Sequence, residues 1–185
     1  FFHNSFFNTI MSFHKKLLHW FGENRRPFPW RDNVEPYKVW LSEIILQQTR
    51  AAQGLPYYES FILNFPTVEK LAAAKEDHVM KLWQGLGYYS RARYLHATAK
   101  TIINKYQGRF PTDFDQIKAL KGVGDYTASA IASICFGQEQ AVVDGNVYRV
   151  LSRIFGMDQP IDASAAQRIY KEKAQYLMKG APPGN

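Results

Sequence analysis

The sequence predicts an all-α fold, and three observations lead to this prediction. Apolar residues recur at helical spacing along most of the 185 residues. No stretch alternates apolar and polar residues as a half-buried strand does. Glycine and proline residues separate the apolar runs. Hydrophobic residues make up 46% of the chain and aromatic residues 15%, which is enough for the core of one domain or of two closely packed lobes.

The net charge is +7, which favours a polyanionic partner such as nucleic acid, although a basic surface also suits anionic membranes. No apolar run approaches the ~20 residues that span a bilayer, and the first residues lack the pattern of a signal peptide. We therefore expect a soluble protein that is not secreted. The single cysteine, Cys135, cannot form an internal disulfide, and its simplest interpretation is a small buried hydrophobic residue.

The first predicted helix covers about residues 6–22 and ends at Gly22. Arg25 to Arg31 then form an arginine-rich turn stiffened by two prolines, in which Trp30 stands beside Arg31. A solvated linker pinned by one buried tryptophan is an equally good interpretation of this segment. The sequence leaves both open.

The next predicted helix covers residues 37–49, with Pro36 near its start. Glu43 lies three residues after Trp40 and thus on the same side of this apolar helix. A carboxyl on an apolar face is costly to ionise, so its pKa should be raised, as a general acid requires. The alternative is an ordinary solvent-facing glutamate.

Helices are also predicted over residues 51–63, interrupted by Pro56, over residues 67–74, and from Lys75 to about Leu82. A loop then exposes Leu86 and two tyrosines between Gly85 and Ser90, and Arg91 and Arg93 follow. This combination suits insertion between bases with neutralisation of phosphates, but a buried turn between helices is at least as good an interpretation. Helices over residues 91–106 and 113–120 come next, the second capped by Thr112 or Asp113.

A helix–hairpin–helix is predicted at residues 120–132. Gly122, Val123 and Gly124 form a tight turn before a helix of small residues, and the unpaired N–H groups at a helix start bind phosphate. An ordinary glycine turn is the alternative. Asp144 follows some twenty residues later at the start of another helix, where it also suits a plain N-cap. A last helix is predicted over about residues 163–178.

Five segments occur in a fixed order along the chain: Pro29-Trp30-Arg31, Trp40 to Thr49, Gly85-Leu86-Gly87-Tyr88-Tyr89, Leu120 to Gly124, and Val143-Asp144-Gly145-Asn146-Val147. They resemble the helix–hairpin–helix DNA glycosylases, most closely the MutY family of adenine DNA glycosylases. The resemblance implies two helical lobes with the active-site cleft between them. The first lobe would be a six-helix barrel over about residues 30–140. The second would be incomplete and comprise about residues 6–29 and 141–185, so that the chain is a fragment of a catalytic domain.

The resemblance also implies a function. The enzyme would flip adenine out of duplex DNA, where it is mispaired with 8-oxoguanine or guanine, and hydrolyse its N-glycosidic bond. Glu43 would protonate the adenine and handle the water, while Asp144 would stabilise the sugar cation. Tyr126 and Asn146 would orient the two carboxylates. The remaining matched residues are the wedge Gln48, Leu86 and Tyr88, the adenine pocket Arg26, Trp30, Arg31 and Leu46, the substrate-binding Thr49, and the DNA-backbone contacts Gly122, Val123 and Gly124.

Bifunctional relatives that also cut the DNA backbone carry a lysine two residues after the second hairpin glycine, where this chain has Tyr126. We therefore expect a monofunctional hydrolase. This chain should bind no metal or cofactor, because the family's 4Fe–4S cluster would need cysteines beyond Asn185. We expect a monomer that binds mispaired duplex DNA and no membrane, in the cytoplasm or nucleoid if the source is bacterial. A thymine glycosylase for G·T pairs and a non-catalytic DNA-binding module are the alternatives.

Overall fold

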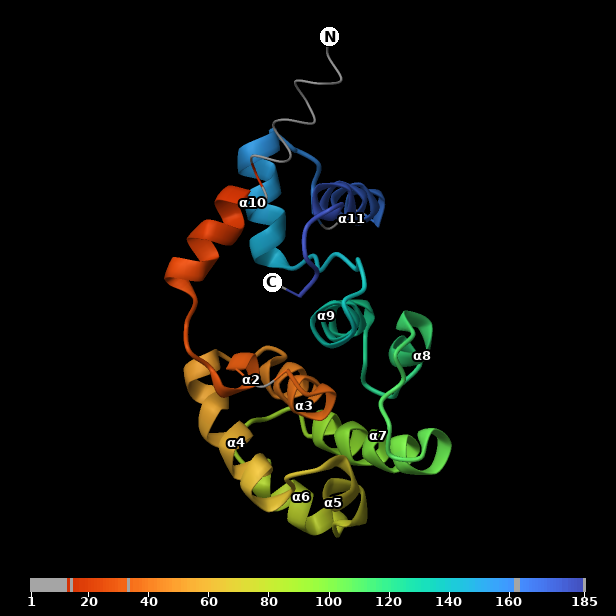
Figure 1. Ribbon diagram of the computed structural model, residues 1–185. Helices are drawn as coiled ribbons and strands as arrows, with labels where there is room; N and C mark the ends of the chain where they lie inside the picture. Colours follow the sequence, from red (N-terminus) through yellow and green to blue (C-terminus); the bar gives the residue numbers. More distant parts are fainter. Residues whose placement is uncertain (1–12, 14, 33, 162–163, 185) are drawn as a thin grey trace.

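The computed structural model describes residues 13, 15–32, 34–161 and 164–184, and within these ranges it contains helices and no strand (Figure 1). The predicted all-α fold is therefore confirmed. Residues 15–24 are helical. The helices that follow are α2 (Pro29–Asp32), α3 (Pro36–Leu46), α4 (Ala51–Asn64), α5 (Val68–Ala73), α6 (Glu76–Leu82), α7 (Ser90–Tyr106), α8 (Phe114–Lys118), α9 (Asp125–Phe136), α10 (Gly145–Phe155) and α11 (Ser164–Met178).

Several predicted boundaries differ from the structure. The helix predicted over residues 37–49 ends at Leu46, because the backbone of Gln48 has a positive φ, and the helix predicted over residues 113–120 ends at Lys118. The first helix, whose predicted start lies outside the described residues, continues past Gly22 to residue 24, where the Asn24 amide donates to the Trp20 carbonyl oxygen at 2.8 Å. Part of the predicted arginine-rich turn is the short helix α2. Helix α4 runs through Pro56 without ending. The missing N–H costs that helix one backbone bond, which the burial of Tyr58 and Phe61 on the same helix outweighs.

Buried apolar side chains form two separate clusters. The larger one joins α3, α4, α5, α6, α7 and α9 around Trp40, Phe61 and Trp83, which are fully buried. The smaller one joins α10 and α11 around Leu151 and Tyr170. In Figure 1, α9 lies between the group α2–α7 and the pair α10 and α11. The boundaries expected for two lobes stay a prediction.

The hairpin between α8 and α9 has the geometry expected from its glycines. Gly122 has a φ of +80°, which an L side chain rarely adopts, and an added Cβ there would lie 2.9 Å from the Tyr94 Cβ. Gly124 has an ordinary φ of −90° and forms the N-cap of α9. The Thr98 hydroxyl donates to the Lys121 carbonyl oxygen at 2.8 Å, which ties the turn to α7.

Segments far apart in the sequence meet around α10 and α11. The helical segment of residues 15–24 runs beside α10 in Figure 1, and the Phe13 and Phe155 rings just beyond it lie 5.9 Å apart between centroids. Helix α11 is tied to the linker after α9, because the Gln175 side chain accepts from the Ala141 N–H at 2.9 Å. These contacts bring α10, which follows Asp144, next to the rest of the molecule.

Candidate active site

Helix α3 carries Glu43 among side chains that are almost all buried. Seven of its residues are buried, namely Tyr37, Val39, Trp40, Leu41, Ser42, Ile44 and Ile45. Burial raises the pKa of the Glu43 carboxyl from 4.5 to about 7, and the positive charge of Arg31 opposes part of this rise. The raised pKa expected from the sequence is thus present. A carboxyl of this kind holds a proton in about half of the molecules at neutral pH, so it has a proton to donate.

The arginine-rich segment before α3 presents cations to this region. The guanidinium carbons of Arg26 and Arg31 lie 5.3 and 5.5 Å from the centroid of the Phe28 ring. Burial and the neighbouring Arg26 and Arg25 lower the pKa of Arg31, while the charge of Glu43 raises it. Arg26 is exposed and Arg31 partly exposed. Arg31 is therefore within electrostatic reach of Glu43, and Arg26 lies beside it on the same segment.

Trp30 anchors this segment. It is 8% exposed, stacks on Phe28 with 4.8 Å between ring centroids, and meets the Tyr58 ring edge-on at 5.1 Å. This arrangement matches the alternative prediction for residues 25–31, in which one buried tryptophan holds the segment against the core. Its role in a base pocket stays a prediction, and so does that of Leu46, which is partly buried at the end of α3.

Asp144 is the N-cap of α10, as the plain structural interpretation predicted. Its Oδ1 accepts from the backbone N–H groups of Asn146 at 3.0 Å and Val147 at 2.8 Å. Its Oδ2 accepts from the Asn146 side-chain amide at 3.0 Å. All three partners donate to the carboxylate, so both of its oxygens are held in place at the start of α10. The cap does not exclude a role for this charge in catalysis, since the carboxylate stays half-buried at the helix start.

Tyr126, in the first turn of α9, connects the two carboxyls. Burial raises the pKa of its phenol to about 12, and the negative charges of both Glu43 and Asp144 add to this rise. Two carboxyls that are far apart in the sequence are therefore within electrostatic reach of one tyrosine. Among the described residues Tyr126 makes no hydrogen bond to either carboxyl, so its expected orienting role stays a prediction, whereas Asn146 does contact Asp144.

The predicted wedge residues differ in exposure. Gln48 is exposed and Tyr88 is 66% exposed, but the side chain of Leu86 is only 7% exposed and belongs to the larger apolar cluster. The expectation that the glycine loop exposes Leu86 is wrong. The loop turns back on α6, where the Trp83 indole N–H donates to the Gly87 carbonyl oxygen at 3.0 Å, and this turn directs Leu86 inward.

The role predicted for Arg91 is also wrong. It was expected to neutralise phosphate, but it is 9% exposed, and its guanidinium donates to backbone carbonyls of α3 and of the glycine loop. Thr49, another predicted substrate-binding residue, is partly buried, and its N–H donates to the Leu46 carbonyl oxygen at 3.1 Å. Thr49 therefore helps to shape the turn that carries Gln48.

Sequence reasoning missed the charges around the hairpin. Val123 is buried, so the hairpin presents to a phosphate its backbone at the two glycines and the exposed side chain of Lys121. Asp125, the first residue of α9, bonds Lys118 at 3.0 Å and also pairs with Lys171 of α11. These two lysines lower the pKa of Asp125. No signal in the sequence predicts the pairing of Asp125 with Lys171, because the two residues meet only when α11 packs beside α9.

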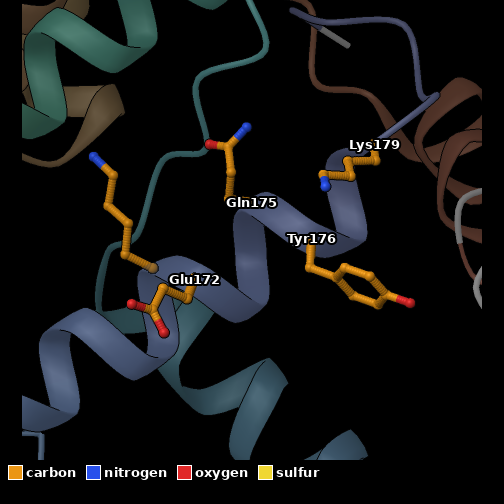
Figure 2. Close-up of a pocket in the computed structure, with 5 residues that line it drawn as sticks. Glu172, Gln175, Tyr176 and Lys179 are labelled. Atoms are coloured by element: carbon orange, nitrogen blue, oxygen red, sulfur yellow. The ribbon is translucent and has the colours of Figure 1, made fainter.

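Two cavities lie elsewhere. One of about 400 Å³ runs along α11 and is lined by Lys171, Glu172, Gln175, Tyr176 and Lys179 (Figure 2). Its side chains come from α11 and the residue that follows it, so it is an open surface hollow rather than an enclosed binding site. The other, of about 170 Å³, lies between the end of α3, the start of α7 and Gly122 of the hairpin. Glu43 and Asp144 line neither.

The described residues do not fit an iron–sulfur cluster. Cys135 is the single cysteine of the chain, and burial together with the charge of Glu43 raises the pKa of its thiol to about 12, away from the thiolate that binds iron. No group of three or more potential metal-binding side chains occurs in the described part of the chain. Likewise, none of the described helices is long and apolar enough to cross a membrane.

Comparison with known proteins links this arrangement to DNA repair. Residues 41–176 match the model of the HhH-GPD superfamily base excision DNA repair proteins. An adenine DNA glycosylase from Buchnera aphidicola subsp. Acyrthosiphon pisum (strain APS) is 44% identical over 80% of the chain. Its counterpart from Homo sapiens is 41% identical over 95% of the chain. The chain spans 43% and 34% of these two relatives' lengths.

A solved structure of a thermostable thymine-DNA glycosylase superimposes with a TM-score of 0.82 at 30% identity, over 92% of this chain and 78% of that one. The sequence match and the structural match thus extend over the segments that carry Glu43, the hairpin and Asp144.

Proposed function

Because the chain belongs to the HhH-GPD superfamily of base excision DNA repair proteins, we propose that it is part of an enzyme that hydrolyses the N-glycosidic bond of adenine mispaired with 8-oxoguanine or guanine in duplex DNA. The observation that carries this proposal is the pair of unlike carboxyls around Tyr126. Glu43 has a pKa of about 7, and Asp144 accepts three hydrogen bonds at the start of α10. The adenine specificity is supported by the names of relatives at 41–44% identity.

Hydrolysis of the N-glycosidic bond needs one carboxyl that carries a proton and one that carries a negative charge. Adenine is a poor leaving group until a ring nitrogen is protonated, and Glu43 has a proton to give near neutral pH. As the bond to the sugar breaks, positive charge develops on the sugar, and a fixed negative charge stabilises it. Asp144 supplies that charge. Glu43, once ionised, takes a proton from the attacking water, which is the division of tasks between two carboxyls seen in glycoside hydrolysis.

The base must first leave the helix stack. Gln48 and Tyr88 are the exposed side chains that would fill the space it vacates, and Arg26 and Arg31 would help to receive the base at Glu43. Gly122 and Gly124 leave the N–H groups at the start of α9 open to a phosphate. Tyr126 stands at the position that is lysine in lyases of this family, so water is the nucleophile and no Schiff base forms.

A single-turnover assay tests the proposal in the full-length protein, with a duplex that holds one adenine opposite 8-oxoguanine. We expect the parent to release adenine and Glu43→Gln to be at least about 100-fold slower, which is the lower end of the range for losing a general acid. Glu59→Gln is the matched control, because Glu59 is exposed on α4. A parent that releases no adenine, or a Glu43→Gln variant with full activity, would remove the basis of the proposal.

Thymine removal from G·T pairs is a second candidate, favoured by the structural match to a thymine-DNA glycosylase at 30% identity. The same assay with the opposing and target bases exchanged separates the two candidates. Trapping with borohydride tests the absence of lyase chemistry, since a substantial covalent complex with DNA requires an amine nucleophile. We further propose that the protein acts as a monomer in the nucleoid if its source is bacterial. Any 4Fe–4S cluster of the family would use cysteines outside this chain.

A further inference from the structure

Two loops of the candidate site contain non-glycine residues in a left-handed backbone conformation. Gln48 has a φ of +57° and Tyr88 a φ of +47°. The third such residue in the described part of the chain, Gln107, ends α7 as a C-cap, where this conformation is common. In loops, L side chains hold such a conformation only when their surroundings impose it. Something near Gln48 and Tyr88 must therefore hold both turns.

The Arg91 guanidinium contacts both turns at once. Its Nη1 donates to the carbonyl oxygens of Gln47 at 2.6 Å, Ile45 at 3.0 Å and Ile44 at 3.1 Å. Its Nη2 lies 3.4 Å from the carbonyl oxygens of both Leu86 and Gly87. No carboxylate in the described ranges pairs with this cation, which backbone carbonyls and the ring of Trp83, 5.1 Å from the guanidinium carbon, surround instead.

Two of the carbonyls that Arg91 contacts immediately precede the residues with a positive φ. The carbonyl of Gln47 shares a planar peptide unit with the N–H of Gln48, and the carbonyl of Gly87 shares one with the N–H of Tyr88. A donor that fixes the orientation of each plane restricts the φ of the residue that follows it. The planar guanidinium has donors on two sides and so reaches both planes, whereas a lysine ammonium is a single point of contact. The guanidinium carbon also lies 5.6 Å from the centroid of the Tyr88 ring.

We propose that Arg91 is a positioning residue that locks the loops of Gln48 and Tyr88 into one arrangement, so that the two side chains enter DNA as a single preformed wedge. The coupling of the loops rests on these contacts alone. The role in DNA rests on the proposed function. A wedge that is ordered before binding loses less conformational entropy when it replaces the departing base. A phosphate-binding role does not fit, because Arg91 is 9% exposed and both of its terminal nitrogens are used.

Hydrogen exchange on the full-length parent protein tests the coupling without any variant. The Thr49 N–H donates to Leu46 and the Leu86 N–H donates to Trp83, each at 3.1 Å, so both amides report on the closed loops. We expect the two amides to exchange with the same protection and the same dependence on low urea concentrations, since one group closes both loops. Independent exchange of the two amides would overturn the proposal.

Arg91→Lys tests the role of the guanidinium, with Arg109→Lys at an exposed position as the matched control. We expect exchange at Thr49 and Leu86 to accelerate about tenfold, as for the loss of one charge-assisted hydrogen bond. Amides inside α7, such as that of Ile102, should keep the parent's protection. A uniform acceleration throughout α7 and α9, or none at Thr49 and Leu86, would show that Arg91 serves general packing and would overturn the proposal.

A fluorescence measurement tests the part that concerns DNA. 2-Aminopurine beside the mispaired adenine brightens when the stack opens. We expect Arg91→Lys to slow this signal about tenfold and to change the affinity for the duplex by less than about threefold, because Arg91 contacts no phosphate. A loss of affinity with an unchanged opening rate would overturn this role. If the parent opens the stack but releases no adenine, the proposed function fails while the loop coupling stands.

Discussion

Replacing Glu43 by glutamine should stabilise the folded protein, and the gain should depend on pH. The folded-state pKa of Glu43 is about 7, against 4.5 for an ordinary glutamate. Each tenfold change in proton affinity corresponds to about 1.4 kcal/mol, so ionising Glu43 in its folded environment costs about 3 kcal/mol. Glutamine keeps the shape of the side chain and never ionises. The variant avoids this cost.

The sign of the effect follows from proton uptake. Between about pH 4.5 and 7 the folded protein keeps a proton at Glu43 that the unfolded chain has lost. The parent's free energy of unfolding therefore falls as pH rises through this window. Below it both states are protonated and the cost is absent. Above it both states are ionised and the full cost of about 3 kcal/mol applies.

Urea unfolding of the parent and of Glu43→Gln across this pH range measures the difference directly. We expect the advantage of the variant to grow from near zero at the acidic end to about 3 kcal/mol at the alkaline end. Glu59→Gln, at an exposed position, should differ from the parent by less than about 0.5 kcal/mol at every pH. Arg31→Met should extend the upper end of this window to higher pH, because Arg31 lowers the folded-state pKa of Glu43 and leaves the unfolded-state pKa unchanged.

An advantage of Glu43→Gln that is the same at every pH would refute this reasoning. Such a result would mean that the gain does not come from removing an ionisable group and that the Glu43 carboxyl ionises at an ordinary pH. The carboxyl would then be an ordinary anion at neutral pH, and the assignment of Glu43 as the proton donor to adenine would lose its physical basis.

Three further predictions use matched pairs of variants. Asp144→Asn should keep the helix cap and its thermal stability, whereas Asp144→Ala should lose about 1 kcal/mol, and both should slow adenine release about 100-fold or more if the charge is needed. Gly122→Ala should lower the melting temperature through its φ of +80° and a close tyrosine, while Gly124→Ala, with nothing within 4 Å, should change it little. Leu86→Ala should lower the free energy of unfolding by about 2–5 kcal/mol. Tyr88→Ala should lower it by less than about 1 kcal/mol and yet slow the opening of the base stack. Equal losses of stability in the two variants would contradict the observed burial of Leu86.

Much of the fold could be predicted because local patterns determine helices. Apolar spacing places α3 and α7 within a few residues of their bounds, and Asp113 and Asp144 cap α8 and α10 as their residue type suggests. The hairpin was recognised from its glycines, of which Gly122 does have the positive φ that only glycine adopts easily. In each case the neighbours that decide the conformation lie within a few positions along the chain.

The sequence by itself also determined the candidates for chemistry, since Glu43 is an acid within an apolar helix and Asp144 an acid at a helix start. Only the tertiary structure decided how they combine. It placed both charges near Tyr126, buried Leu86 that a glycine loop was expected to expose, and turned Arg91 from solvent to the carbonyls of α3. The physical reason is that burial and electrostatic fields depend on distance in space. Helical periodicity shows which face of a helix is apolar, but not which distant segment covers that face.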